Sequence, residues 1–164
     1  MGKDEVQRIK KRFELMNVVP EYLEHEAVIT SEDAAKTRGF ELKQGIKAIL
    51  FTNSNNDWVV VNIPADKKCD IKKVAEKLGW SKSKIRMATQ EEVLEKTGCE
   101  IGAVPPFDHK ENIRLLVDKG IYDNESGYSA FNIGLRTKSV KIKTELMKDV
   151  FKKFSAIDGD FSKE

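Results

Sequence analysis

Two short apolar runs separated by a polar turn, residues 46–51 and 58–63, constrain the fold more than any other feature of this sequence. The residues between them, 53–57, read Asn-Ser-Asn-Asn-Asp, which is the composition of a turn. The second run is rich in β-branched residues, which favour strands. The two runs therefore predict a hairpin at the middle of a sheet.

The rest of the chain alternates between helical and extended patterns with short links. Apolar residues recur at helical spacing near the N-terminus, at Val6, Ile9, Phe13 and Met16, so we expect the chain to open with an amphipathic helix. Capping patterns and glycines predict further helices at 30–39, 70–79, 89–98 and 144–154, and apolar runs predict strands at 113–117, 128–133 and 140–142. This interleaving predicts one mixed α/β domain over residues 1–154, followed by a C-terminal tail over 155–164.

Lys47 interrupts the first apolar run. Side chains alternate between the faces of a strand, so Lys47 shares a face with Ile49 and Phe51. A charge on a covered apolar face is costly unless it meets an anionic partner or reaches solvent. Three interpretations follow: Lys47 is salt-bridged, it reaches solvent at the strand end near Gly45, or it is functional.

The loop Gly102-Ala103-Val104-Pro105-Pro106-Phe107 is the second candidate feature. A glycine lets a ligand approach the backbone closely, and prolines make a loop stiff, so its amide groups stay aimed in one direction. Such donors can stabilise a carbonyl oxygen that becomes an oxyanion. The alternative is an ordinary rigid connection between a helix and a strand.

Positive charge is concentrated in two stretches, although the whole chain carries 29 basic and 27 acidic residues. Residues 66–86 hold eight basic and three acidic side chains, and residues 136–153 hold seven basic and two acidic ones, so each stretch is close to +5. These stretches either form a surface that faces phosphates or are simply solvated faces.

The small number of cysteines and histidines limits which disulfides and metal sites this chain can form. Cys69 and Cys99 are too few for a disulfide framework and are not spaced as metal ligands, and with only His25 and His109 we expect no zinc site. All four are interpreted as structural or surface residues. No apolar stretch is long enough to span a membrane, and a charged start argues against a signal peptide, so a reduced, cytoplasmic protein is expected.

Four segments in the same order and spacing resemble the YbaK and prolyl-tRNA-editing family, whose domain is also inserted in bacterial prolyl-tRNA synthetases. They are HEAVITSEDAA at 25–35, GIKAIL at 45–50, TGCEIGAVPPF at 97–107 and NIGLR at 132–136. The third matches the family's glycine-x-x-x-proline loop, with Gly102 and Pro106 in the defining places. The similarity runs from about Tyr22 to Leu146.

The resemblance implies a central mixed, largely antiparallel sheet that curls toward a barrel, with surrounding helices. It implies a deacylase that hydrolyses, in trans, the ester of a mischarged tRNA, most often the tRNA for proline. The expected partners are the acceptor end of aminoacyl-tRNA and a prolyl-tRNA synthetase. Neither a metal, an organic cofactor nor a membrane is implied.

The resemblance also assigns roles to six residues. Lys47 would hold the phosphate of the terminal adenosine or orient the substrate, and Gly102 with its loop would position the aminoacyl carbonyl and its attacking water. Thr30, together with Pro106, Asn132 and Gly134, would form the substrate pocket. The chain has no Ser-His-Asp pattern, which agrees with a site that relies on orientation and oxyanion support.

Departures from the family's pattern leave alternatives open. Ala103 and Pro105 stand where relatives often have Gly and Ser, so a catalytically inactive tRNA- or protein-binding module is one alternative. Asn132 lies near where some subfamilies have a histidine. The amino acid that is removed (cysteine, alanine, serine or threonine) stays open.

A helix-turn-helix DNA-binding protein is the remaining alternative. Ala75, Gly79 and Ile85 have the spacing of that motif within a basic stretch. The next predicted helix, 89–98, is acidic, which argues against it.

Overall fold

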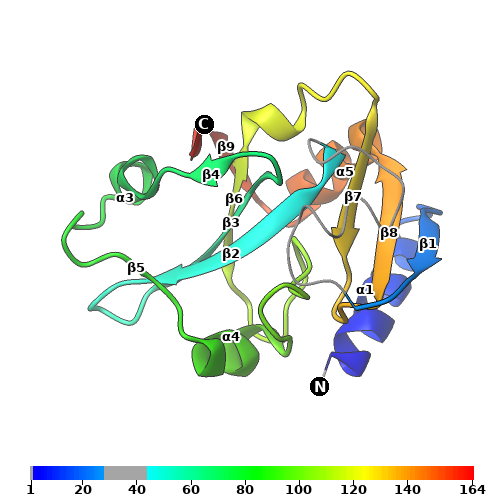
Figure 1. Cartoon of the computed structure of the whole chain (residues 1–164), viewed down its shortest axis with the longest axis horizontal. Coiled ribbons are helices and arrows are strands. Elements are labelled where there is room, and N and C mark those ends of the chain that lie inside the picture. The colour runs from blue at the N-terminus through cyan, green and yellow to red at the C-terminus, as the bar shows by residue number, and fades with distance from the viewer. Residues whose placement is uncertain (1, 28–43) are drawn as a thin grey trace.

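The structure is a computed structural model that describes residues 2–27 and 44–164, and its strands form two main sheets with helices around them (Figure 1). The helix predicted at 30–39 lies outside the described residues, as does Thr30. The chain opens with α1 (Lys3–Leu15), which places Val6, Ile9 and Phe13 in the core as their spacing predicts.

The larger sheet is built on the predicted hairpin. β2 (Ile46–Thr52) and β3 (Trp58–Pro64) pair antiparallel along their whole length, from Ile46 opposite Pro64 to Thr52 opposite Trp58. This pairing confirms the hairpin and its turn.

Three more strands extend this sheet in the order β5-β2-β3-β6-β9. β6 (Arg114–Asp118) runs parallel to β3, and β9 (Ile157–Gly159) runs parallel to β6. On the other side, the short β5 (Arg86–Met87) pairs with β2 only at Phe51 and Thr52. The hairpin therefore lies inside the sheet, as predicted.

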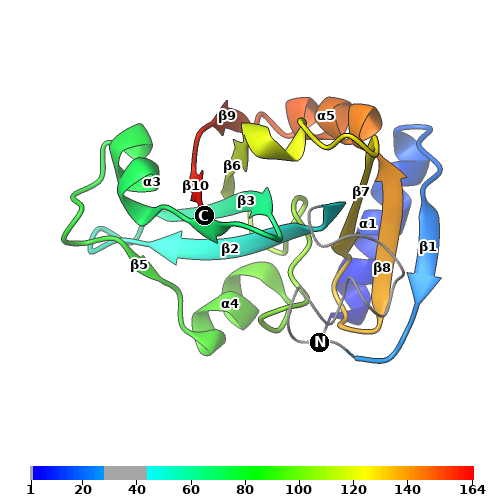
Figure 2. The same ribbon diagram turned by 45° about the horizontal axis from the view of Figure 1, so that its top comes forward.

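The smaller sheet has the order β1-β8-β7 and is antiparallel throughout. It contains β1 (Glu21–Glu24), β7 (Tyr128–Asn132) and β8 (Lys138–Lys143). A single bridge between Gly45 and Ala130 joins the start of β2 to β7. Figure 2 shows β7, β8 and β1 side by side at that end of β2.

Two helices, α3 and α4, begin and end where the capping residues predict. The Asp70 side chain accepts a hydrogen bond at the start of α3 (Ile71–Leu78), and Gly79 ends it in a left-handed conformation. Thr89 and Glu92 form a complete capping box on α4 (Gln90–Thr97). The η2 turn (Lys119–Ile121) follows β6, and α5 (Thr144–Lys153) follows β8. None of the helices in the described part of the chain is long and apolar enough to cross a bilayer.

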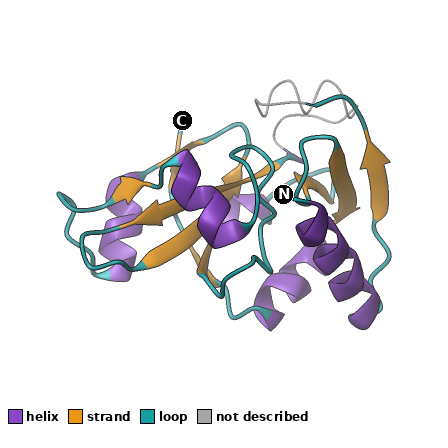
Figure 3. Cartoon of the chain, turned by 90° about the horizontal axis from the view of Figure 1, so that it is seen from below, coloured by secondary structure: helices purple, strands orange, loops and turns teal. Residues whose placement is uncertain are grey.

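Two hydrophobic clusters cover the two faces of the β2–β3 hairpin. The larger one joins α1, α5 and the smaller sheet to Ile46, Leu50 and Val60. Phe107 lies at its centre, with its ring 5.6 Å from that of Phe13 and 6.3 Å from that of Phe131. Figure 3, seen from below, shows the helix at the N-terminus lying against the smaller sheet.

The second cluster lies on the opposite face, where α3 covers the hairpin. Its buried members are Phe51, Val59, Val61, Ile63, Val74, Leu116 and Phe161. Coverage on both faces is what the apolar pattern of residues 46–51 indicates.

The expectation of a mixed α/β fold with a largely antiparallel sheet is confirmed. Of the seven strand pairs among the described residues, five are antiparallel. The strands form separate sheets joined by the Gly45–Ala130 bridge rather than a closed barrel.

The predicted tail, residues 155–164, is wrong, because this segment belongs to the domain. β9 extends the larger sheet, and β10 (Ser162–Lys163) pairs with β4 (Lys68–Cys69). Phe161 between them is buried in the second cluster. Strands of two or three residues are too short to show a period, and their partners are far away in the sequence, so the local pattern gave no signal.

The helix-turn-helix alternative is also wrong. α3 and α4 are separated by residues 79–89, which include strand β5. A helix-turn-helix needs two helices joined by a tight turn of about three or four residues.

We predict that Phe161→Ala lowers the free energy of unfolding by about 3–5 kcal/mol, because it removes a fully buried aromatic ring. Urea denaturation followed by circular dichroism measures this difference. Ile157→Ala, in the same segment but 39% exposed, is the matched control and should cost much less. Equal, small effects for both variants would restore the interpretation of residues 155–164 as a tail.

Candidate functional site

The loop between α4 and β6, residues 98–107 and hereafter the Gly102 loop, is fixed to the core at both ends. Gly98 ends α4 in a left-handed conformation, and Phe107 is fully buried. Ala103 and Val104 are also buried and belong to the larger cluster. Gly102 has a φ of 88°, which favours glycine at this position.

Side chains of the β7–β8 hairpin hold the first half of the Gly102 loop. Arg136 donates from Nε and Nη2 to the Ile101 carbonyl at 3.0 and 2.6 Å, and its guanidinium pairs with Glu100. Asn132 donates from Nδ2 to the Gly102 carbonyl. The structure therefore brings together two of the predicted site residues, Gly102 and Asn132.

The second half of the loop is held from two other elements. The Pro105 carbonyl lies 2.7 Å from His109 Nε2, and the Pro106 carbonyl accepts from Asn62 Nδ2 at 3.0 Å. Four carbonyl groups of residues 101–106 are thus occupied by side chains.

The backbone N–H groups of the loop differ from these carbonyl groups in their hydrogen bonding. The backbone N–H groups of Gly102 and Val104 form no hydrogen bond within residues 2–27 and 44–164. A stiff loop with four carbonyls anchored and with uncommitted amides, those of Gly102 and Val104 among them, can offer donors to a developing oxyanion.

A chain of polar contacts continues from Asn132 to Ser139 and His25. The Ser139 hydroxyl donates to Asn132 Oδ1 at 3.1 Å and lies 2.7 Å from His25 Nε2. His25 Nδ1 lies 2.8 Å from the Glu26 carbonyl. Asn132 and Ser139 are direct partners in the β7–β8 register, and this register is the signal that could have predicted their contact.

Lys47 lies in β2, is partly buried and has no ion pair within the described part of the chain. Burial lowers its pKa, and the nearby Cys69 and Asp66 oppose that shift. The salt-bridged interpretation therefore finds no partner among the described residues, and a desolvated cation remains.

The Lys47 side chain and the Gly102 loop lie on opposite faces of the larger sheet. Ala48, the next residue, pairs with Asn62, and Asn62 contacts the loop through Pro106. Lys47 points to the other face, together with Ile49 and Phe51, where α3 and Cys69 lie. Local sequence patterns do not indicate which face of the sheet the loop covers, because that depends on long-range packing.

Gly134 follows β7 and packs against the start of α1. It has a φ of 131°, and a Cβ atom there would lie 2.7 Å from the Gly2 carbonyl oxygen and 2.9 Å from Glu5 Cβ. Packing therefore accounts for a glycine at this position. Pro106 is buried within the loop, and the predicted role of Thr30 concerns a residue outside the described ones.

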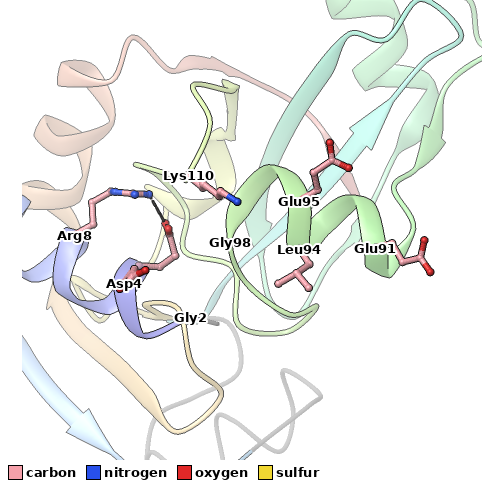
Figure 4. A pocket seen from close by; sticks show the side chains of 9 residues that line it. Gly2, Asp4, Arg8, Glu91, Leu94, Glu95, Gly98 and Lys110 are labelled. Carbon is pink, nitrogen blue, oxygen red and sulfur yellow. Dashed lines mark hydrogen bonds and ion pairs between the residues drawn. The ribbon is translucent and has the colours of Figure 1, made fainter.

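A cleft of about 430 Å³ lies between α1 and α4, beside the start of the Gly102 loop (Figure 4). Its charged lining consists of four acidic residues and two basic ones: Asp4, Glu5, Glu91, Glu95, Arg8 and Lys110. An acidic lining repels phosphates, so this cleft is unsuited to nucleic acid. Among the residues that the structure describes, no three His, Cys, Asp or Glu side chains gather as they would around a metal ion.

Known proteins resemble this chain over most of its length. Residues 25–150 match the family described as the aminoacyl-tRNA editing domain. The Ser/Thr-tRNA deacylase ProXp-y of Escherichia coli strain K12 is 35% identical over 123 residues, covering 73% of this chain and 72% of the deacylase. The proline–tRNA ligase of Aquifex aeolicus is 31% identical over 105 residues, which cover 64% of this chain but 18% of the ligase.

A solved structure of a candidate trans-editing enzyme for prolyl tRNA synthetase has the same fold. It superposes with a TM-score of 0.82 and covers 98% of both chains, at 22% sequence identity. At that identity the likeness supports the fold alone.

We predict that buried His109 makes the fold acid-sensitive. Burial lowers the pKa of His109 from 6.5 to about 4, so the unfolded chain binds a proton more readily than the folded one between these values. Stability should therefore fall by about 3 kcal/mol as the pH drops from 6.5 to 4. Denaturant titrations across this range measure the effect, and His109→Gln should flatten that part of the profile. An unchanged profile in the variant would show that another group is responsible.

Proposed function

The chain belongs to the aminoacyl-tRNA editing domain family, and on that premise we propose that it hydrolyses the ester between a wrongly attached amino acid and its tRNA. The observation that carries this proposal is the Gly102 loop. Its carbonyl groups are anchored by four side chains, while the Gly102 and Val104 amides stay uncommitted within the described residues.

The proposed reaction needs little more than orientation, because an ester is already an activated acyl group. Water attacks the carbonyl carbon, and the carbonyl oxygen takes up negative charge. Gly102 and Val104 N–H groups donate to that oxygen and stabilise the tetrahedral intermediate. The intermediate then collapses, the ester bond breaks, and the ribose oxygen leaves with a proton. Asn132 contributes by fixing the Gly102 carbonyl.

Lys47 is the proposed phosphate ligand at the acceptor end of the tRNA. It is a desolvated cation without an ion pair among the described residues, and an approaching phosphate would satisfy it. It lies on the face that α3 covers, so α3 and its basic residues stand on the same side. A substrate that contacts both Lys47 and the Gly102 loop would extend around the edge of the sheet. It would do so along the part of β2 that precedes Phe51, because β5 pairs with β2 only from Phe51 onward.

The basic stretches supply a surface for the rest of the tRNA. In residues 66–86, only Lys67, Lys73 and Arg86 form ion pairs with described residues. Five cations of that stretch stay unpaired within the described part of the chain: Lys68, Lys72, Lys77, Lys82 and Lys84. Lysines without internal salt bridges are available for phosphate contacts.

The substrate proposal follows the relatives. Similarity to a Ser/Thr-tRNA deacylase makes serine and threonine the first amino acids to test, and similarity to proline–tRNA ligases points to the tRNA for proline. The enzyme would act in trans in the cytoplasm beside a prolyl-tRNA synthetase. Pro106 and Gly134, with Thr30, remain proposed contributors to the amino-acid pocket.

We predict that the wild type deacylates at least one member of a panel of Cys-, Ala-, Ser- and Thr-charged tRNAs, and that Lys47→Ala slows this at least about 10-fold. The reason is that a displaced acceptor end misaligns the ester against the loop. Loss of radiolabelled amino acid from the tRNA measures the rate, and circular dichroism confirms folding.

Two further variants sharpen this test. Lys47→Arg keeps the charge and should retain more activity than Lys47→Ala, while Lys110→Ala removes an exposed lysine from the acidic cleft and should act like wild type. An inactive wild type across the panel would support the alternative of a binding module that has lost catalysis. A fully active Lys47→Ala would remove Lys47 from the site and leave the enzyme standing.

We also predict that tRNA affinity falls as salt is added, because lysine–phosphate contacts release counterions. Affinity measured by filter binding should change with a log–log slope of roughly −0.7 to −0.9 for each phosphate contacted. Replacing Lys72 and Lys77 together by Gln should make the slope shallower if α3 contacts the tRNA, and the same change at Lys152 and Lys153 tests α5. A salt-insensitive affinity would exclude the basic stretches from binding.

A further inference from the structure

Asn62 and His109 are two buried polar side chains that hold consecutive carbonyl groups of the Gly102 loop. Asn62, in β3, is 0% exposed and donates from Nδ2 to the Pro106 carbonyl at 3.0 Å and to the Leu116 carbonyl at 3.4 Å. His109 is 7% exposed, and its Nε2 lies 2.7 Å from the Pro105 carbonyl.

Asn62 is out of place for stability alone. It stands between Val61 and Ile63 in a strand whose other members are buried, apart from the partly exposed Trp58, and are mostly β-branched. Its Oδ1 is buried and has no hydrogen-bond partner within the described part of the chain. An unsatisfied buried acceptor lowers stability, so an apolar residue would suit the strand better.

The orientation of the Asn62 amide is fixed by its contacts. Both neighbours of Nδ2 are carbonyl oxygens, which can only accept, so exchanging the nitrogen and oxygen would set three acceptors against one another. The unpaired Oδ1 is therefore a consequence of using Nδ2 to hold Pro106.

His109 is constrained in the same way. The Pro105 carbonyl can only accept, so Nε2 carries the hydrogen and donates it. Burial lowers the pKa of the ring to about 4, so the ring is neutral near pH 7. It acts there as a single fixed donor.

These contacts determine where the loop's amides point. Pro105 and Pro106 have no N–H groups, so their carbonyls are the polar backbone atoms through which this half of the loop can be anchored. The Val104 N–H lies between the Gly102 carbonyl, held by Asn132, and the Pro105 carbonyl, held by His109. Its direction is thus set from both sides.

We propose that Asn62 and His109 are positioning residues for deacylation, which hold Pro105 and Pro106 so that the Val104 amide is aimed at the reacting carbonyl. This inference rests on the proposed function. A positioning role predicts an effect on kcat with little change in KM, because the aimed donors act on the transition state.

The test uses three variants of the full chain with a charged tRNA that the wild type deacylates. Asn62→Leu and His109→Met remove the donors with apolar side chains of similar length, and each should lower kcat at least about 10-fold with KM within about 2-fold. His109→Gln keeps an N–H donor near the position of Nε2 and should restore most of kcat.

Ser129→Ala is the matched control for loss of a buried hydrogen bond. Ser129 is 1% exposed and bonds the Thr144 hydroxyl at 2.8 Å, and within the described part of the chain its side chain makes no hydrogen bond to the Gly102 loop. It should lose stability and keep its kcat. If Asn62→Leu and His109→Met behave like this control, with less stability and full kcat, the two residues are structural and the proposal is overturned.

A second measurement separates this proposal from the proposed function. Amide hydrogen exchange, followed by NMR without substrate, should be faster at Val104 in Asn62→Leu and His109→Met than in wild type or Ser129→Ala. An inactive wild type whose Val104 amide responds in this way refutes deacylation and keeps the positioning role. Unchanged exchange at the Val104 amide refutes the positioning role, whatever the activity.

Discussion

The antiparallel pairing of β2 with β3, covered on both faces, is the constraint on which the rest of the structure depends. Its register sets Lys47 opposite Ile63 and Ala48 opposite Asn62. Because the side-chain period of a strand is two, this single register assigns every residue of the hairpin to one of two cores. The α3 helix and Phe161 then cover one face, and the Gly102 loop with α1 and the smaller sheet covers the other.

Local patterns in the sequence predicted the elements well and their assembly less well. The hairpin, the caps at Asp70 and Thr89, and the closing helix follow from turn composition and hydrogen-bond chemistry within a few residues. The strands at the C-terminus did not follow, since β9 and β10 gain their stability from β6 and β4, more than 30 residues away. A local sequence pattern indicates an element that neighbouring residues in the chain stabilise. The strands β9 and β10 depend on distant partners instead, so no local pattern indicates them.

The candidate site shows the same division. Gly102, Pro106 and Asn132 could be selected from a resemblance in sequence, and the structure brings Gly102 and Asn132 into contact. The sequence could not point to Asn62, His109 and Ser139, because the role of each depends on a hydrogen bond to a residue elsewhere in the fold. The sequence alone led to the same interpretation of His25 and His109 as structural or surface residues. In the structure, His25 contacts Ser139 in the polar chain that leads to Asn132, and His109 is buried against the Pro105 carbonyl.

The separation of Lys47 from the Gly102 loop by the thickness of a sheet has an evolutionary consequence. In the proposed enzyme, one face would contact the nucleic acid and the other would contact the aminoacyl group. Substitutions in one core should leave the packing of the other largely unchanged, because β2 and β3 lie between the two cores. Lineages could thus change which amino acid is removed while keeping the same grip on tRNA, which would let one scaffold diversify into editors of different selectivity.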